Sequence, residues 1–361
     1  MEFKKSYYNK VKKLTDFVAK TWDPKMKWMW GEALLGYAMD ELDKENGRED
    51  YSPFLRKYCD YWVKADPSVD QSDTAAPGLI TYAMFKRDGK AEYKYLTDKV
   101  LDYIRYEPRL YLDCLNHLGC SKKGKIYPKS VWIDSVMMFS VFTSLYAKEN
   151  GDRELLDFAA RQPKQYADMM LDKQHGLWAH SYWVKQKTPF PKRNIFWGRG
   201  NGWVICAFPM ILDNIGLDHK ESPKIIELFN NTCEALLGCM NDDYTFNTLL
   251  KHKSYRELSA TALISAGWLH GIRRGYLDKK FLYPAIKAFE ACVDAMEENG
   301  DEIYMTEISG PTIPLPLLPK LGYKAVPIGK NWSYGIAALV FAAIEYKRYF
   351  DENNIDRNCT M

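Results

Sequence analysis

A single aspartate stands inside an otherwise apolar run of the sequence. Asp134 lies within residues 131–139, Val-Trp-Ile-Asp-Ser-Val-Met-Met-Phe, where an unpaired carboxylate either destabilises the fold or takes up a proton. A carboxyl group whose pKa is raised by apolar surroundings can act as a general acid near neutral pH. We therefore predict that Asp134 is catalytic; the structural alternatives are a capping residue or the partner of an arginine.

A second candidate is the segment 197–203, which reads Trp-Gly-Arg-Gly-Asn-Gly-Trp. It lacks the lysine and the preceding strand of a phosphate-binding loop. Its glycines let the backbone approach a ligand closely, and an arginine can bind a carboxylate with two parallel hydrogen bonds. We expect this segment to bind a ligand, with four side chains facing it: Trp197, Arg199, Asn201 and Trp203.

Four more residues are candidates for substrate binding because each lies near the start of an expected helix or in a loop. Trp30 and Trp132 offer flat rings of the kind that stack on sugars. Asp73 could bind a ligand or cap a helix, since it is followed within a turn by a proline. His180 could bind a sugar hydroxyl or carboxylate, or simply be packed.

One short stretch of the sequence contains cysteines and a histidine at a spacing similar to that of a metal site. Cys114, His117 and Cys120 are evenly spaced, but no further Cys-x-x-Cys or histidine pair supplies the fourth ligand that structural zinc requires. We predict that the protein binds no metal and needs no cofactor. The eight cysteines are scattered along the chain and indicate reduced thiols in a cytoplasmic protein.

Helical periodicity dominates the sequence, and few strands are expected. Twelve helices are predicted, at residues 3–20, 31–45, 51–64, 75–87, 92–105, 132–149, 153–171, 200–215, 221–239, 257–273, 279–298 and 332–350. Every second one is apolar on most faces and must be surrounded by protein, whereas the others are amphipathic. This alternation predicts an all-α fold, an (α/α)6 toroid of six helical hairpins forming a single domain over residues 1–361.

In such a toroid the inner helices begin at one shared opening, where several of the candidate residues above would meet. Helix N-termini carry partial positive charge and free N–H donors, so this opening favours an acidic ligand. With tryptophan rings beside it, the opening suits an acidic, ring-shaped molecule such as a uronic-acid sugar.

Overall composition excludes other partners. The 361 residues carry a formal charge of only +3, which gives no electrostatic case for nucleic acid or an anionic membrane. No uninterrupted stretch of 18 apolar residues occurs, and the charged N-terminal segment does not read as a signal peptide. The sequence does not predict an oligomeric state.

These motifs, at this spacing, resemble those of the unsaturated glycuronyl hydrolases, and most closely the unsaturated rhamnogalacturonyl hydrolases of glycoside hydrolase family 105. The resemblance spans roughly residues 25–345 and is most specific in Trp132-Ile-Asp134 and in the 197–203 heptad. It implies an (α/α)6 barrel that removes a 4,5-unsaturated uronic acid from the non-reducing end of small oligosaccharides released by polysaccharide lyases.

The resemblance also implies roles for individual residues. Asp134 matches the carboxyl that protonates the vinyl-ether double bond and activates water, and Asp73 matches a second active-site aspartate. Substrate-binding positions of the family match His180, Trp197, Arg199 and Trp203. Trp183 departs from the family, since an acidic residue is usual there, and so do Ser135 and the loop 110–125; these changes bear on which glycan is accepted.

The sequence leaves two alternatives to a hydrolase open. A sugar epimerase or isomerase on the same barrel would need a pair of facing histidines, and His180 has no evident partner in the sequence. A non-enzymatic helical scaffold that binds carbohydrate would tolerate replacement of Asp134 by asparagine.

Overall fold

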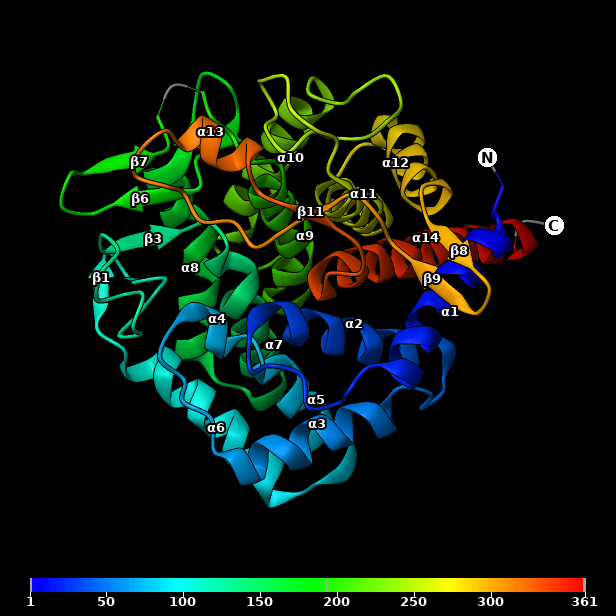
Figure 1. Ribbon diagram of the computed structural model, residues 1–361, viewed down its shortest axis with the longest axis horizontal. Helices are drawn as coiled ribbons and strands as arrows, with labels where there is room; N and C mark the ends of the chain where they lie inside the picture. Colours follow the sequence, from blue (N-terminus) through cyan, green and yellow to red (C-terminus); the bar gives the residue numbers. More distant parts are fainter. Residues whose placement is uncertain (1, 193, 360–361) are drawn as a thin grey trace.

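The computed structural model describes residues 2–192 and 194–359, and six of its helices form a closed inner ring (Figure 1). Each inner helix contacts the next one in the chain, and the last contacts the first. The predicted (α/α)6 toroid is therefore the observed architecture. The inner helices are α2 (Trp30–Asn46), α5 (Gly78–Asp88), α7 (Val141–Asn150), α9 (Gly198–Ile215), α11 (Leu258–Arg273) and α14 (Ser333–Cys359).

Six amphipathic helices pack around the outside of this ring, each on an inner neighbour. They are α1 (Lys5–Thr21), α3 (Ser52–Ala65), α6 (Ala91–Tyr106), α8 (Arg153–Met170), α10 (Ser222–Leu237) and α12 (Leu282–Asp294). Within the described residues, no helix is both long and apolar enough to cross a membrane.

Small residues allow the inner helices to pack closely. Helix α11 is buried from Leu258 to Ile272, and a Cβ added at Gly267 would lie only 2.2 Å from the backbone oxygen of Ile205 in α9. A side chain at this position would push the two helices apart. The Ala, Gly and Ser residues of this helix are therefore needed for the ring to close, because larger side chains would not fit between the helices.

Helix boundaries differ from the prediction mainly at the opening of the ring. The helix expected from residue 132 starts later, because residues 130–132 pair as a strand before a π-helical turn, η1 (Val136–Ser140), leads into α7. A separate short helix, α4 (Ser72–Ala75), precedes α5. Two further short helices are η2 (Lys279–Phe281) and α13 (Pro319–Lys324).

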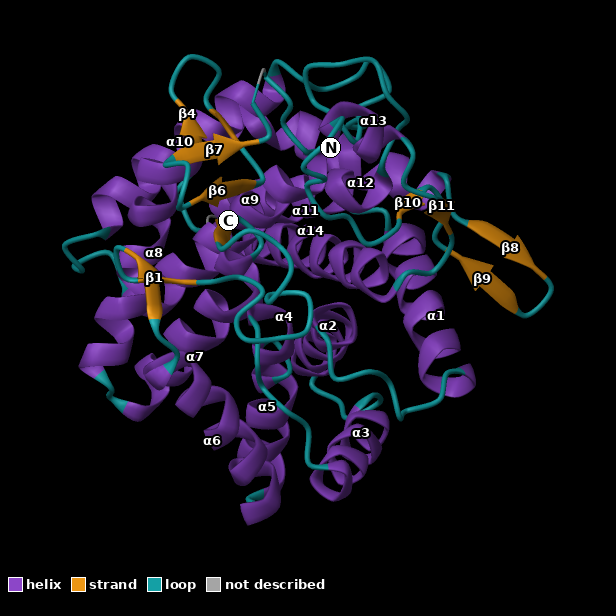
Figure 2. Ribbon diagram, turned by 60° about the vertical axis from the view of Figure 1, so that its left-hand side comes forward, coloured by secondary structure: helices purple, strands orange, loops and turns teal. Residues whose placement is uncertain are grey.

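Strands are short and lie in the connections between helices (Figure 2). None of those in the described residues exceeds three residues. One three-stranded antiparallel sheet, in the order β3-β6-β7, lies in the segment that contains Asp134 and His180. The strands are β1 (Arg109–Tyr111), β2 (Cys114–Leu115), β3 (Ser130–Trp132), β4 (Leu171–Asp172), β5 (Leu177–Trp178), β6 (Ser181–Trp183), β7 (Thr188–Phe190), β8 (Glu297–Asn299), β9 (Glu302–Tyr304), β10 (Ile308–Ser309) and β11 (Ile328–Gly329).

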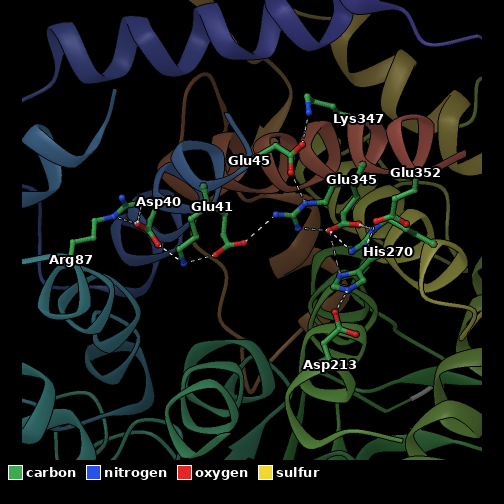
Figure 3. Close-up of polar contacts among 12 residues, drawn as sticks. Asp40, Glu41, Glu45, Arg87, Asp213, His270, Glu345, Lys347 and Glu352 are labelled. Atoms are coloured by element: carbon green, nitrogen blue, oxygen red, sulfur yellow. Dashed lines mark hydrogen bonds and ion pairs between the residues drawn. The ribbon is translucent and has the colours of Figure 1, made fainter. Parts of the chain in front are cut away.

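A network of ion pairs joins five inner helices, α2, α5, α9, α11 and α14, near their C-terminal ends (Figure 3). His270 of α11 contacts Asp213 of α9 at 2.9 Å and Glu345 of α14 at 3.7 Å. Arg348, one turn further along α14, pairs with Glu345 at 3.0 Å and with Glu45 of α2 at 2.7 Å. The first and last inner helices are thus tied together by charge at the end of the ring away from their N-termini.

Candidate active site

A cavity of about 270 Å³ lies where the inner helices begin. Its walls come from the N-terminal ends of α2, α4, α9 and α14 and from the segment that follows β3. Six of the nine residues proposed from sequence line it together: Trp30, Asp73, Trp132, Asp134, Trp197 and Arg199. Residues separated by more than 160 positions in the chain therefore meet at one opening, as the toroid requires.

Strand pairing sets the position of Asp134 next to His180. In the β3–β6 ladder Trp132 lies opposite Ser181, and the Ile133 N–H donates to the backbone oxygen of His180 at 2.9 Å. The Asp134 carboxylate then lies 3.2 Å from the His180 Nε2, Oδ2 being the nearer oxygen. Its backbone oxygen accepts from Met137 and Met138, so Asp134 stands at the start of the π-helical turn, a widened element that is frequent at functional sites.

The electrostatics of this pair differ from the expectation for an isolated carboxyl. Burial, the largest single influence, raises the pKa of Asp134, but His180, His117 and a backbone hydrogen bond together outweigh it and hold that pKa below its ordinary value of 3.8. The predicted rise in the pKa of Asp134 is therefore wrong, because the sequence does not reveal its partner. Burial in turn lowers the pKa of His180 below 6.5, and His117 and Arg199 add to this. At neutral pH the free pair thus consists of a carboxylate and a neutral imidazole.

The other ring nitrogen of His180 is also held. Nδ1 lies 2.8 Å from the hydroxyl of Tyr323 on α13, and burial raises the pKa of that phenol well above 10. Since the phenol stays protonated, it can donate to Nδ1 when the imidazole is neutral. This arrangement leaves the proton of the neutral ring on Nε2, the nitrogen that lies 3.2 Å from Asp134 Oδ2 without a hydrogen bond to it.

A second aspartate–histidine pair has both members in the cavity lining, whereas of the first pair only Asp134 lines the cavity and His180 does not. His117 Nε2 lies 3.4 Å from Asp73 Oδ1, and its Nδ1 lies 2.9 Å from the hydroxyl of Ser135, the residue after Asp134. The Ser72 N–H donates to the backbone oxygen of His117, which places the two segments side by side. Helix α4 is capped by Gln71, so Asp73 does not fill the capping role considered from sequence.

His117 was missed as a site residue. The sequence drew attention to it only as part of a metal pattern, and the three members of that pattern have separate partners. Cys114 lies against Gln165, and Cys120 lies against the backbone oxygen of Asp70. Across the described residues no group of three or more Cys, His, Asp or Glu side chains is arranged to hold a metal ion.

Indole rings back both histidines. Trp197 stacks on His180, with ring centres 4.3 Å apart, and Trp132 stacks on His117 at 4.4 Å. Trp30 stacks instead on Tyr334 at 4.5 Å, which joins the first and last inner helices at the rim of the cavity. The predicted tryptophan platforms are therefore present, but two of them also fix the orientation of an imidazole.

Arg199 lines the cavity in a different way from the one expected. Its side chain is fully buried, and its terminal nitrogens donate to the backbone oxygens of Ser309 and Gly310 and to the hydroxyl of Thr312. It also lies 3.6 Å from Glu257, the N-cap residue of α11. The Arg199 guanidinium group, which was expected to bind a substrate carboxylate, thus holds residues 309–312 across the opening. Among the described groups, only its Nε atom lacks a hydrogen-bond partner.

Two residues of the heptad do not face the cavity. Asn201 is buried and exchanges hydrogen bonds with the backbone of Trp178, while its amide also donates to the Trp197 oxygen. Trp203 is fully buried and meets Trp30 edge to face. Neither side chain lines the cavity, because a helix turns successive residues to different sides, and their roles in substrate binding stay predictions.

A tryptophan-lined cavity at the mouth of an α/α ring, with one aspartate–histidine pair in its lining and another beside it, has the size and the acid–base groups for chemistry on a sugar. Sequence comparison gives the family: residues 3–350 match Glycosyl Hydrolase Family 88, and the chain belongs to it. It is therefore a glycoside hydrolase, which confirms the family resemblance found in the motifs.

Curated relatives are distant but cover most of the chain. The unsaturated rhamnogalacturonyl hydrolase YesR of Bacillus subtilis is 23% identical over 340 residues, which cover 93% of this chain and 95% of the relative. An unsaturated 3S-rhamnoglycuronyl hydrolase of an Alteromonas species is 25% identical over 271 residues, covering 72% of this chain and 62% of the relative.

Solved structures share the fold. A family 105 glycoside hydrolase of C. acetobutylicum superposes with a TM-score of 0.83 at 23% identity, over 93% of this chain and 99% of the other. The unsaturated glucuronyl hydrolase of Bacillus sp. GL1 has a TM-score of 0.74 at 14% identity, over 94% and 95% of the two chains.

Proposed function

We propose that this enzyme removes a 4,5-unsaturated uronic acid from the non-reducing end of small oligosaccharides, with rhamnogalacturonan fragments as the first substrates to test. The observation that carries the proposal is the buried Asp134–His180 pair, 3.2 Å apart, beside a sugar-sized cavity lined by tryptophan. The relatives named above support the unsaturated substrate, since both carry such an activity in their names.

The reaction needs a group that first gives and later takes a proton. In the proposed route Asp134, once protonated, donates its proton to C4 of the C4=C5 double bond, and water adds to C5 while its proton passes to the same carboxylate. The resulting hemiketal opens by breaking the bond between C5 and the ring oxygen, and the hemiacetal left at C1 expels the remaining sugar as an alcohol. One carboxyl therefore serves both steps, unlike the two-carboxylate scheme of ordinary glycosidases.

His180 can supply the proton that Asp134, with its low pKa, does not hold at neutral pH. When the pair takes up one further proton, His180 is an imidazolium, and its Nε2 is close enough to Oδ2 to pass a proton to Asp134 and become a neutral ring again. Asp134 can then act as an acid although its carboxyl is ionised in the free enzyme. The electrostatic environment suits an acidic substrate as well, because the inner helices direct their N-termini at the cavity.

The epimerase alternative is disfavoured by the same contacts. His117 is the histidine that lines the cavity, and His180 lies near it without being part of the lining. Both nitrogens of each ring are within 3.4 Å of a side-chain partner: Ser135 and Asp73 for His117, Tyr323 and Asp134 for His180. Each imidazole thus faces its own carboxylate, although His180 Nε2 makes no hydrogen bond among the described groups, whereas such an epimerase needs two imidazoles on opposite faces of one sugar carbon.

The test uses oligosaccharides from lyase-treated rhamnogalacturonan. Their conjugated double bond absorbs ultraviolet light, and the absorbance must decay when the wild-type enzyme is added. Asp134→Asn should lower kcat by about 100- to 10,000-fold, the usual contribution of a general acid–base group. Glu32→Gln is the matched control, because Glu32 lines the same cavity and burial raises its pKa. Decay that survives in Asp134→Asn but is lost in Glu32→Gln would reassign the catalytic acid.

We propose in addition that the enzyme works in the cytoplasm on imported fragments. The seven cysteines whose side chains the structure describes are all free thiols, as is usual in reducing compartments. Fractionation of the producing cells, with activity measured in each fraction, tests this placement.

A further inference from the structure

A second and larger cavity lies beside the catalytic one, and we call it the lysine groove. Its volume is about 860 Å³, and it is bounded by the β6–β7 hairpin on one side and by α13 on the other. Figure 1 shows α13 beside the end of this hairpin, at the edge of the ring. The groove is built from aromatic and aliphatic side chains together with three lysines, Lys192, Lys320 and Lys324.

A row of aromatic rings connects the two cavities. Trp132, which lines the catalytic cavity, meets Tyr127 edge to face at 5.4 Å, and Tyr127 meets Trp183 at 6.3 Å. Trp183 in turn stacks on Phe190 at 4.0 Å, and both of these rings line the lysine groove. Tyr127, Trp183 and Phe190 are only half-buried, so ring surface remains for sugar units to stack on.

The segments around this row of aromatic rings carry only positive charge. Four segments, residues 121–130, 184–192, 249–254 and 310–329, contain eleven lysines and no aspartate or glutamate. Each contributes a residue to one of the two cavities. The net charge of +3 conceals this cationic rim, because the rest of the chain has more acidic than basic side chains.

The three groove lysines have no acidic partners of their own. No carboxylate among the described side chains lies within ion-pair distance of Lys192, Lys320 or Lys324. Lys320 and Lys324 stand four residues apart and exposed on α13, and Lys192 follows β7 across the groove. Apolar ring faces flanked by unpaired ammonium groups match a chain of sugars that carries carboxylates at intervals.

We propose that the lysine groove is an outer subsite that holds the acidic sugars following the unsaturated uronyl residue. This inference rests on the function proposed above and specifies its substrate as an oligosaccharide with at least one further uronic acid.

The experiment compares unsaturated disaccharide and tetrasaccharide from the same lyase digest. The wild-type enzyme should cleave the tetrasaccharide with a kcat/KM about tenfold higher, the equivalent of one or two exposed ion pairs and a stacking contact. The double variant Lys320→Gln/Lys324→Gln should lose most of this preference through a higher KM and leave disaccharide turnover unchanged. Lys57→Gln/Lys64→Gln, on the outer helix α3, is the matched control and should change neither.

Trp183→Leu tests the aromatic part separately. It should raise KM for the tetrasaccharide while disaccharide turnover reports that the variant is folded. Added salt should reduce the wild-type preference but not that of the Lys320→Gln/Lys324→Gln variant.

Each remaining outcome is decisive. Equal kcat/KM for both substrates in the wild type overturns the subsite and leaves the hydrolase function standing, whereas no turnover of either substrate overturns the hydrolase function. An equal loss on both substrates in the lysine variant overturns the subsite in favour of general electrostatic attraction. If sedimentation shows that the wild type dimerises and the lysine variant does not, the groove is an interface between two copies, and the subsite is again overturned.

Discussion

Replacing Glu345 by glutamine should destabilise the fold without touching the active site. The Glu345 carboxylate is 6% exposed and lies 2.7 Å from Arg273 and 3.0 Å from Arg348. Glutamine keeps the shape but removes the negative charge, which leaves two arginines and His270 facing an uncharged amide. Breaking a buried ion pair in this way usually costs about 3–5 kcal/mol.

This free energy converts into a melting temperature. With about 2 cal/mol/K of unfolding entropy per residue, ~1 kcal/mol shifts the Tm of a 361-residue chain by about 1.3 °C. We therefore expect Glu345→Gln to melt about 4–7 °C below the wild type in calorimetry. Glu352→Gln is the matched control: Glu352 pairs with the same Arg273 at 3.1 Å but is 53% exposed, so its loss should shift Tm by about 1 °C or less.

The pH dependence of this difference has a defined sign. Burial raises the pKa of Glu345, but His270 and the arginines outweigh it and hold that pKa below 4.5. A depressed carboxyl pKa stabilises the fold above its unfolded value and loses that effect as the pH falls. The gap in Tm between wild type and Glu345→Gln should therefore be full at pH 7 and shrink below about pH 4.5. Equal shifts for Glu345→Gln and Glu352→Gln would refute the assignment of a buried, stabilising network.

Three further predictions concern the catalytic cavity. The Asp134–His180 pair must carry the proton that makes His180 an imidazolium, and burial keeps the pKa of His180 below 6.5. We therefore expect kcat/KM to be highest at acidic pH and to fall about tenfold per pH unit above that pKa. A flat profile from pH 5 to 8 would contradict this scheme. Tyr323→Phe removes the partner of His180 Nδ1, and should lower kcat and move the alkaline limb of the pH–rate profile while leaving Tm nearly unchanged. Arg199→Lys replaces two separate terminal nitrogens by one compact ammonium group, which does not reproduce the geometry of the bonds to Ser309, Gly310 and Thr312. Hydrogen exchange of residues 309–312 should therefore accelerate and KM should rise; unchanged exchange there would show that Arg199 acts on the substrate instead.

The helical ring was predictable because its signal is local and repeated. Helices that must be buried on every side show it in their composition, as in the Ala-, Gly- and Ser-rich run of α11, and their alternation with amphipathic helices left little choice of architecture. The inner N-termini then followed from geometry, which is why Asp73, Asp134 and Trp197 could be assigned to one opening without any knowledge of distances.

The parts that sequence analysis missed depend on long-range partners. From the sequence alone, Arg199 is interpreted as a substrate-binding residue, because its hydrogen-bond acceptors lie 110 or more positions away in the chain. Asp134 reads as an isolated buried carboxyl until strand register brings His180 beside it. His117 carried no periodic or motif signal of its own. In each case the local sequence specifies the side chain, but a contact made by the tertiary fold decides its protonation state or its availability.

Ring closure links stability to catalysis in this fold. Trp30 begins the first inner helix and Tyr334 lies at the start of the last, and their stacked rings form one edge of the catalytic cavity. At the opposite ends of the same two helices, Glu45 pairs with Lys347 and Arg348. Because a helix transmits a displacement along its length as a rigid body, the cavity stays assembled only while this seam between α2 and α14 is closed. Heating should therefore abolish activity and helicity at the same temperature, and Glu345→Gln should lower both midpoints together while leaving kcat below them unchanged. A separation of the two midpoints in that variant would show that the cavity assembles independently of the seam.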